Sequence, residues 1–118
     1  MARPFEFDDA DRDEARLRQF CLCAHCGESL DDLVEHGHHV VPNQSGRPGQ
    51  ETDNWIGTAE NCVILCDTCH YRVHENGRFW LGATAPPSYF PFSHGNNSLS
   101  HHLWVEDLET RIKAKWDD

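Results

Sequence analysis

The pattern of apolar and polar positions predicts a helix near each end of the chain. Residues 8–20 carry acidic side chains first and arginines last, an order that suits the helix dipole, and Asp8 or Asp9 can cap the first turn. Residues 101–116 have the spacing of an amphipathic helix. Its apolar face is expected to hold Leu103, Leu108 and Ile112 together with Trp104 or Val105.

Short strand patterns follow in the first half of the chain. Residues 32–37 and 38–41 are predicted to be the two strands of a hairpin, with Gly37 at a turn or bulge, and Pro42 ends the second strand. Residues 43–61 are polar and contain several glycines, so they are predicted to form a long loop. A loop of that length in a compact domain is usually functional or disordered.

The second half of the pattern is an apolar run followed by a helix. Residues 61–66 predict a short buried strand, and residues 67–76 predict a helix that Gly77 closes. Residues 79–100 show no clear period. Helices and short strands in this order predict a small α+β fold, and a chain of 118 residues is expected to form a single domain.

Composition suggests that the domain needs help to stay folded. Hydrophobic residues make up 38% of the chain and the mean hydropathy is −0.68, which is thin for a self-sufficient core of this size. Bound metal or cross-links are therefore expected. No apolar run is long enough to span a bilayer, and the first residues contain no apolar signal segment. These features predict a protein that stays in the cytoplasm and does not enter a membrane.

The net charge argues against a simple nucleic-acid binder. Ten Lys and Arg residues face twenty Asp and Glu residues, a formal charge of −10, whereas nucleic-acid binders are normally basic on the binding face. The acidic residues are clustered, however, and residues 36–48 contain no carboxylate. A neutral or positive face on an acidic body is therefore expected, and a bound metal would add positive charge.

Six cysteines without a secretory signal favour metal binding over disulfides. Two C-x-x-C pairs let two tight turns aim four thiolates at one ion, so the sequence predicts a closed structural zinc site. The remaining cysteines are Cys21, whose spacing does not suit a knuckle, and Cys62, expected to be a buried free thiol. The zinc ligands are expected to be Cys23, Cys26, Cys66 and Cys69.

Four histidines suggest a second site. His70 and His74 are four residues apart, so they share one side of the predicted helix, about a quarter-turn from the cysteines. His38 and His39 are neighbours on a predicted strand, so they are expected to point to opposite faces. One of them could bind an ion while the other faces the attacking water.

These motifs resemble the HNH endonuclease family. The resemblance rests on His38-His39-x-x-Pro42, then Asn61, then His70-x-x-x-His74, with the C-x-x-C pairs around them, and it covers about residues 23–76. It implies a ββα-metal core over residues 21–76, stabilised by structural zinc. Flanking segments with helices are expected at residues 1–20 and 77–118.

The resemblance also implies roles for single residues. His38, His70 and His74 would bind one catalytic ion, His39 would be the general base, and Asn61 would orient the segment that holds it. Three imidazoles favour Zn²⁺, Ni²⁺, Co²⁺ or Mn²⁺ over Mg²⁺, which prefers oxygen ligands but could still support turnover.

The expected activity is metal-dependent cleavage of DNA phosphodiester bonds with little sequence specificity, and RNA stays open as a substrate. Trp55 could stack on bases or wedge into a groove. Phosphate contacts are expected from Arg47, Arg72 and Arg78. The alternative is a non-catalytic zinc module that binds protein or nucleic acid, and it would hold one ion per chain instead of two.

The chain also resembles the nuclease ends of bacterial polymorphic toxins and secreted effectors. That resemblance implies delivery into a target cell, and a dedicated immunity protein could then be a partner. A thiol redox role is disfavoured because no βαβ context surrounds a C-x-x-C motif.

Overall fold

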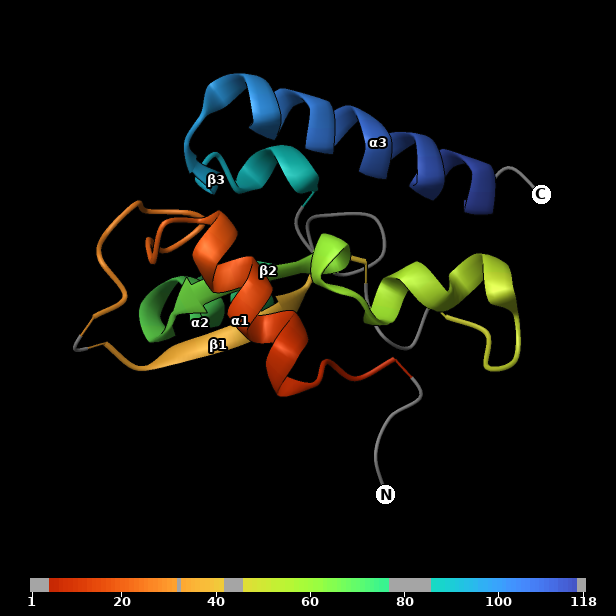
Figure 1. Ribbon diagram of the computed structural model, residues 1–118, viewed down its shortest axis with the longest axis horizontal. Coiled ribbons are helices and arrows are strands. Elements are labelled where there is room, and N and C mark those ends of the chain that lie inside the picture. The colour runs from red at the N-terminus through yellow and green to blue at the C-terminus, as the bar shows by residue number, and fades with distance from the viewer. Residues whose placement is uncertain (1–4, 32, 42–45, 77–85, 117–118) are drawn as a thin grey trace.

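The computed structural model describes residues 5–31, 33–41, 46–76 and 86–116. All three predicted helices and the apolar strand are present, so the α+β class is confirmed. The radius of gyration is 13.4 Å, close to the value of about 13.5 Å expected for a compact chain of this length. The helices and strands are α1 (Asp9–Arg18), β1 (Glu35–His39), β2 (Cys62–Cys66), α2 (Asp67–Asn76), β3 (Ser93–Asn96) and α3 (Ser98–Trp116) (Figure 1).

Strands β1 and β2 form a two-stranded antiparallel sheet in which Gly37 faces Ile64 and His39 faces Cys62. The predicted hairpin within residues 32–41 is therefore wrong, because β1 runs unbroken through Gly37. A side chain at Gly37 would lie 3.2 Å from Cδ of Arg12, so the glycine leaves room for α1 rather than a turn. The true partner strand lies too far along the chain for a local pattern to reveal it.

Helix α1 begins as the charge pattern predicts. Asp8 accepts a hydrogen bond from the Asp11 amide, and the Asp11 side chain accepts one from the Asp8 amide, a reciprocal cap. Beyond the helix, the buried side chain of Gln19 bonds to both the amide and the carbonyl of Ile64. Arg18 donates to three backbone carbonyls, of Ala59, Cys62 and Ser93. These bonds fix α1 to β2 and to the start of β3.

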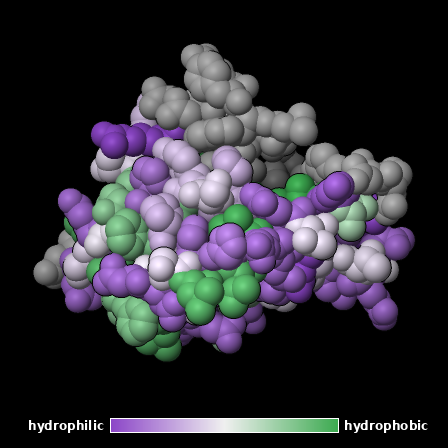
Figure 2. Space-filling view, turned by 90° about the horizontal axis from the view of Figure 1, so that it is seen from above, coloured by the Kyte–Doolittle hydropathy of each residue, from purple (hydrophilic) through white to green (hydrophobic). Residues whose placement is uncertain are grey.

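Every residue of β2 is buried, and the main core forms around it. Helix α3 closes this core with Trp104 and Leu108, which are 6% and 0% exposed. Leu103 was expected on the same face, but it is 57% exposed and points to solvent. Viewed from above, the surface shows separate hydrophobic patches among hydrophilic residues (Figure 2). None of the helices in the described part of the chain combines the length and apolar character that a bilayer crossing requires.

The long polar segment is folded where the structure describes it. Residues 51–57 and 59–61 form 3-10 helices, η2 and η3. The buried carboxylate of Asp53 accepts hydrogen bonds from the amide and side chain of Arg47. Ile56 joins Phe5 and Val41 in a second small core cluster. The segment is thus a packed part of the domain that lies beside the end of β1.

Candidate metal centres

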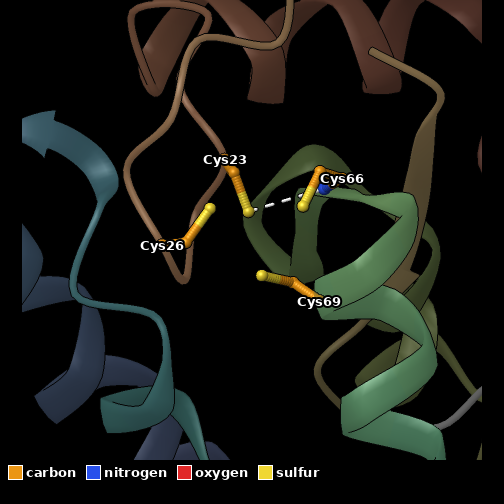
Figure 3. A group of neighbouring side chains, drawn as sticks. All are labelled: Cys23, Cys26, Cys66 and Cys69. Carbon is orange, nitrogen blue, oxygen red and sulfur yellow. Dashed lines mark hydrogen bonds between the residues drawn. The ribbon is translucent and has the colours of Figure 1, made fainter.

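The four cysteines of the C-x-x-C pairs converge on one point (Figure 3). Cys23 and Cys26 come from the segment after α1, Cys66 ends β2, and Cys69 lies in the first turn of α2. Their sulfur atoms all lie within 4.8 Å of one another. Tetrahedral zinc with bonds of about 2.3 Å separates its sulfurs by about 3.8 Å, so this cluster could hold a zinc ion.

The first knuckle has the backbone that such a site needs. Gly27 has a φ of 76°, a left-handed conformation that glycine adopts without strain. Its amide donates to the Cys23 carbonyl at 3.0 Å, closing the turn around Cys26. A Cβ at Gly27 would lie 2.8 Å from the ring of Phe92, so glycine is required there for space as well as for conformation.

The electrostatics of the four thiols also suit a cation. Burial and the neighbouring Cys23 sulfur raise the pKa of Cys69. Burial opposes ionisation of Cys23 too, but backbone amide hydrogen bonds outweigh it and lower the pKa of that thiol. Four adjacent thiols cannot all lose their protons in a buried place unless a positive ion compensates the charge. The cluster can therefore hold four thiolates only together with a bound cation.

The other two cysteines lie outside this cluster. The Cys21 sulfur accepts a hydrogen bond from Nη1 of Arg16 at 2.9 Å. Cys62 is fully buried, and burial raises the pKa of its thiol to about 12. Cys62 is thus an inert buried thiol, as the sequence predicted, and Cys23 rather than Cys21 completes the first pair.

The second cluster consists of His38 on β1 and of His70 and His74 on α2. One ring nitrogen of each lies within 4.8 Å of the others, and Nε2 of His70 and Nε2 of His74 are 3.0 Å apart. His38 is 3% exposed, and its buried Nε2 has no hydrogen-bond partner among the described residues. A buried polar atom without a partner is costly in a folded protein, and a metal ion would satisfy it. These residues therefore fit a divalent ion bound by imidazoles.

Protonation of the cluster is suppressed. Burial lowers the pKa of His38 to about 3, and the neighbouring rings of His74 and His70 act in the same direction. Burial and His74 also lower the pKa of His70. Only a neutral imidazole can donate a lone pair to a metal, so these shifts keep the rings in the ligand form at neutral pH.

His39 points to the opposite face of β1, as alternation along a strand predicts. Its ring stacks on Phe7 with centroids 3.9 Å apart and planes 12° apart. Its Nε2 lies 2.6 Å from the carbonyl oxygen of Phe5. A carbonyl only accepts hydrogen bonds, so Nε2 must carry the proton, and Nδ1 is the basic nitrogen of the neutral ring.

Asn61 is fully buried at the end of η3, beside the first residue of β2. Its Oδ1 accepts from the Val41 amide at 2.8 Å, and its Nδ2 donates to the carbonyls of Val41 and Ile56. The Asn61 carbonyl also accepts from the Val40 amide at 3.1 Å. The side chain thus holds the segment that directly follows His39.

A fourth histidine and a carboxylate border the histidine cluster. Nε2 of His36 lies 2.7 Å from Oδ1 of Asp67, and the His36 ring stacks on His70 with centroids 4.4 Å apart. The sequence did not point to Asp67 as a neighbour of the histidines. Only the register of β1 against β2, which pairs Glu35 with Cys66, brings them together. Beside them is a surface hollow of about 500 Å³, lined by Asp67, Thr68, His70, Tyr71 and His74.

The described residues among those proposed for nucleic-acid contacts lie at separate places. Arg47 is paired with Asp53 at 3.0 Å, Arg72 lies exposed on α2, and Arg78 lies outside the described residues. Trp55 is half-buried against the core, and the guanidinium of Arg111 lies 5.5 Å from its ring centroid. It is therefore packed rather than extended toward a ligand.

The remaining histidines that the structure describes have partners of their own. Nδ1 of His25 lies 2.8 Å from the Tyr89 carbonyl, and its ring stacks on Tyr89. His94 and His101 both contact the Ser93 hydroxyl, and His102 pairs with Glu106. The potential metal clusters found in the described residues are the four cysteines and the three histidines.

Comparison with known proteins gives a partial match. No protein-family model and no solved structure matches the chain. A 59-residue stretch is 32% identical to the Type IV methyl-directed restriction enzyme EcoKMcrA of Escherichia coli (strain K12), and it covers 45% of this chain. It covers 18% of that enzyme, so the chain spans less than a fifth of the relative's length. The match is compatible with the HNH resemblance, but it does not establish a family.

Proposed function

We propose that the protein is a metal-dependent endonuclease of the HNH type, with a ββα-metal core formed by β1, β2 and α2. The observation that carries the proposal is the buried Nε2 of His38, which lies near His70 and His74 and has no hydrogen-bond partner in the described part of the chain. A zinc scaffold requires only the cysteines, whereas an ion at this second cluster would satisfy the buried His38 nitrogen. The partial likeness to a restriction enzyme supports a nuclease that acts on DNA.

The histidines of the site and Asn61 would have different roles in phosphodiester hydrolysis. His38, His70 and His74 would hold one divalent ion, and such an ion supplies positive charge for the phosphate and the leaving oxygen. Nδ1 of His39 takes a proton from water, whose oxygen then bonds to phosphorus. The bond from phosphorus to the 3′-oxygen breaks, and that oxygen gains a proton from solvent. The hydrogen bonds of Asn61 to Val41 hold in place the segment that follows His39.

Substrate contact would use the α2 side of the molecule. Arg72 is exposed there, and its guanidinium forms no ion pair among the described residues, whereas Arg47 is paired with Asp53. Phosphate contacts of this kind position a duplex without reading its bases, so little sequence preference is expected. Neither delivery as a toxin nor an immunity protein is supported by the comparisons, and both stay predictions.

The non-catalytic zinc module is the alternative function. It predicts one metal per chain and no cleavage, and it leaves the arrangement of the three histidines unexplained. No observation favours it over the nuclease.

Plasmid cleavage tests the proposal. Purified protein is mixed with supercoiled DNA and Mg²⁺, Mn²⁺, Ni²⁺ or Zn²⁺, with and without EDTA. We expect metal-dependent nicking that disappears in His39→Ala and His74→Ala. The matched control is His102→Ala, which changes an exposed histidine on α3 and should cut normally. Folded, zinc-bearing protein that cuts neither DNA nor RNA with any metal would overturn the proposal.

A further inference from the structure

The N-terminal segment Phe5–Phe7 contacts the proposed base from outside the core that resembles HNH enzymes. Phe7 stacks flat on the His39 ring, and the Phe5 carbonyl accepts the Nε2 proton. Each contact restricts a different motion: the stacked ring limits tilting, and the hydrogen bond limits rotation about the ring axis. The contacts also leave Nδ1 as the basic nitrogen, because Nε2 is the donor.

The segment is itself firmly held. Phe5 and Phe7 are each 5% exposed. The Phe5 ring packs with Val41 and Ile56, and the Phe7 carbonyl accepts from Nη1 of Arg12 at 2.9 Å. Because the segment is held in place, its contacts with His39 can also hold the His39 ring in one orientation.

Gly57 permits the close approach of this segment. A Cβ at Gly57 would lie 3.1 Å from the Phe5 Cα and 3.2 Å from the Phe5 carbonyl oxygen. A side chain there would push on the backbone atoms that bond His39. Gly57 lies in the same polar segment whose end, Asn61, holds Val41. The described surroundings of His39 thus include residues 5–7 and, through Phe5, the segment between the strands.

We propose that Phe5–Phe7 is a positioning segment that sets the orientation and tautomer of His39. The proposal rests on the proposed function for its catalytic consequence, but its structural part does not. Phe7 and Gly57 are positioning residues because they act through the base and not on the substrate. A small displacement of a reacting group can cost on the order of a hundredfold in rate, so even a modest loosening of this segment should be visible.

The first measurement is independent of activity. Long-range ¹H–¹⁵N NMR of ¹⁵N-histidine-labelled protein reports which ring nitrogen carries the proton. We expect the Nε2–H tautomer of His39 in the wild type and a mixture of tautomers in Phe7→Leu and Gly57→Ala. The matched control is Tyr89→Leu, which removes a similar stacked ring from His25 and should leave the His39 signals unchanged. Unchanged His39 signals in both test variants would overturn the proposal.

The second measurement is steady-state cleavage across a pH series. Phe7→Leu is expected to lower kcat by about tenfold or more with little change in KM, and to shift the acidic limb of the pH profile. Phe7→Tyr keeps the aromatic face and should restore most of the rate. Equal zinc content and urea midpoints near the wild-type value separate a positioning effect from misfolding. Wild-type protein without activity would count against the nuclease alone, whereas active Phe7→Leu with an unchanged profile would count against the positioning segment alone.

Discussion

Asn61 and Val41 form two hydrogen bonds with each other, and these bonds join the two ends of the polar segment between β1 and β2. The Val41 amide donates to Oδ1 of Asn61 at 2.8 Å, and Nδ2 of Asn61 donates to the Val41 carbonyl at 3.0 Å. A third bond, from Nδ2 to the Ile56 carbonyl, uses the other amide proton. One fully buried amide therefore satisfies three backbone groups between the proposed base and the second strand.

Asn61→Ala is expected to lower stability by about 3–5 kcal/mol, because three buried backbone groups lose their partners. Asn61→Asp should also be costly, since a carboxylate cannot donate to the two carbonyls. Urea unfolding monitored by circular dichroism measures the change. Asn54→Ala alters an exposed asparagine of η2 and should stay within about 0.5 kcal/mol of the wild type. A loss for Asn61→Ala as small as that of the control would contradict the structural role.

Zinc removal is expected to unfold the domain. The four cysteines come from the segment after α1, the end of β2 and the start of α2, so a bound metal would cross-link three parts of the chain. Cys26→Ser should therefore lose zinc and the cooperative unfolding transition. Cys21→Ser changes a cysteine outside the cluster and should keep both. Metal analysis by mass spectrometry and thermal unfolding provide the readout, and a folded, zinc-free Cys26→Ser protein would refute this expectation.

Much of the chemistry could be read from residue spacing. The two C-x-x-C pairs and the His70-x-x-x-His74 pair are local patterns on tight turns and on one helix, and local geometry is what spacing predicts. The opposite directions of His38 and His39 follow from strand alternation for the same reason. The structure brings these groups together as two clusters.

Long-range relationships could not be read in this way. The partner of β1 is a strand whose pairing with Gly37 follows from the whole fold, so the local pattern suggested a hairpin instead. The contact of Phe5 and Phe7 with His39 joins residues more than thirty positions apart. By contrast, the start of α3 was missed although a signal existed. The Asn97 side chain accepts from the Ser100 amide, so this asparagine caps a helix that begins at Ser98.

The stability of the protein is expected to decrease as the pH is lowered, and protonation of His38 contributes to this decrease. Its pKa is about 3 in the folded protein and about 6.5 when unfolded, so the unfolded chain binds more protons between these values. Stability is therefore complete above pH 6.5 and is lost as pH falls toward 3, by up to about 1.4 kcal/mol per pH unit from this group. His94, whose pKa is lowered to about 4 by burial, Arg18 and His101, contributes in the same direction.

Urea unfolding of the wild type and of His38→Gln at pH 7.0, 6.0 and 5.5 measures that contribution. The cysteine cluster and His94 are common to both proteins, so the difference in slope isolates His38. The variant should lose less stability on acidification than the wild type. Parallel curves for the two proteins would show that His38 is protonated as easily in the folded state as in the unfolded one.

Arg72 is expected to be the phosphate contact nearest to the histidine cluster among the described arginines. Most of the other described arginines already have partners within the protein. Carboxylates pair with Arg12, Arg16, Arg47 and Arg111, and Arg18 donates hydrogen bonds to backbone carbonyls. Arg72→Ala should weaken DNA binding equally for different sequences. Each lost phosphate contact should also reduce the salt dependence of the binding constant by about 0.9 in a log–log plot.

Fluorescence anisotropy with two unrelated duplexes at several salt concentrations tests this expectation. The protein is the non-cleaving His39→Ala variant, with and without Arg72→Ala. Lys113→Ala removes an exposed positive charge from α3 instead of α2, and it should leave the salt slope unchanged. An equal loss in both charge variants would indicate a response to net charge alone. A loss confined to Arg72→Ala would place the DNA over α2, beside the histidine cluster, and so would give an acidic protein a local site for a polyanion.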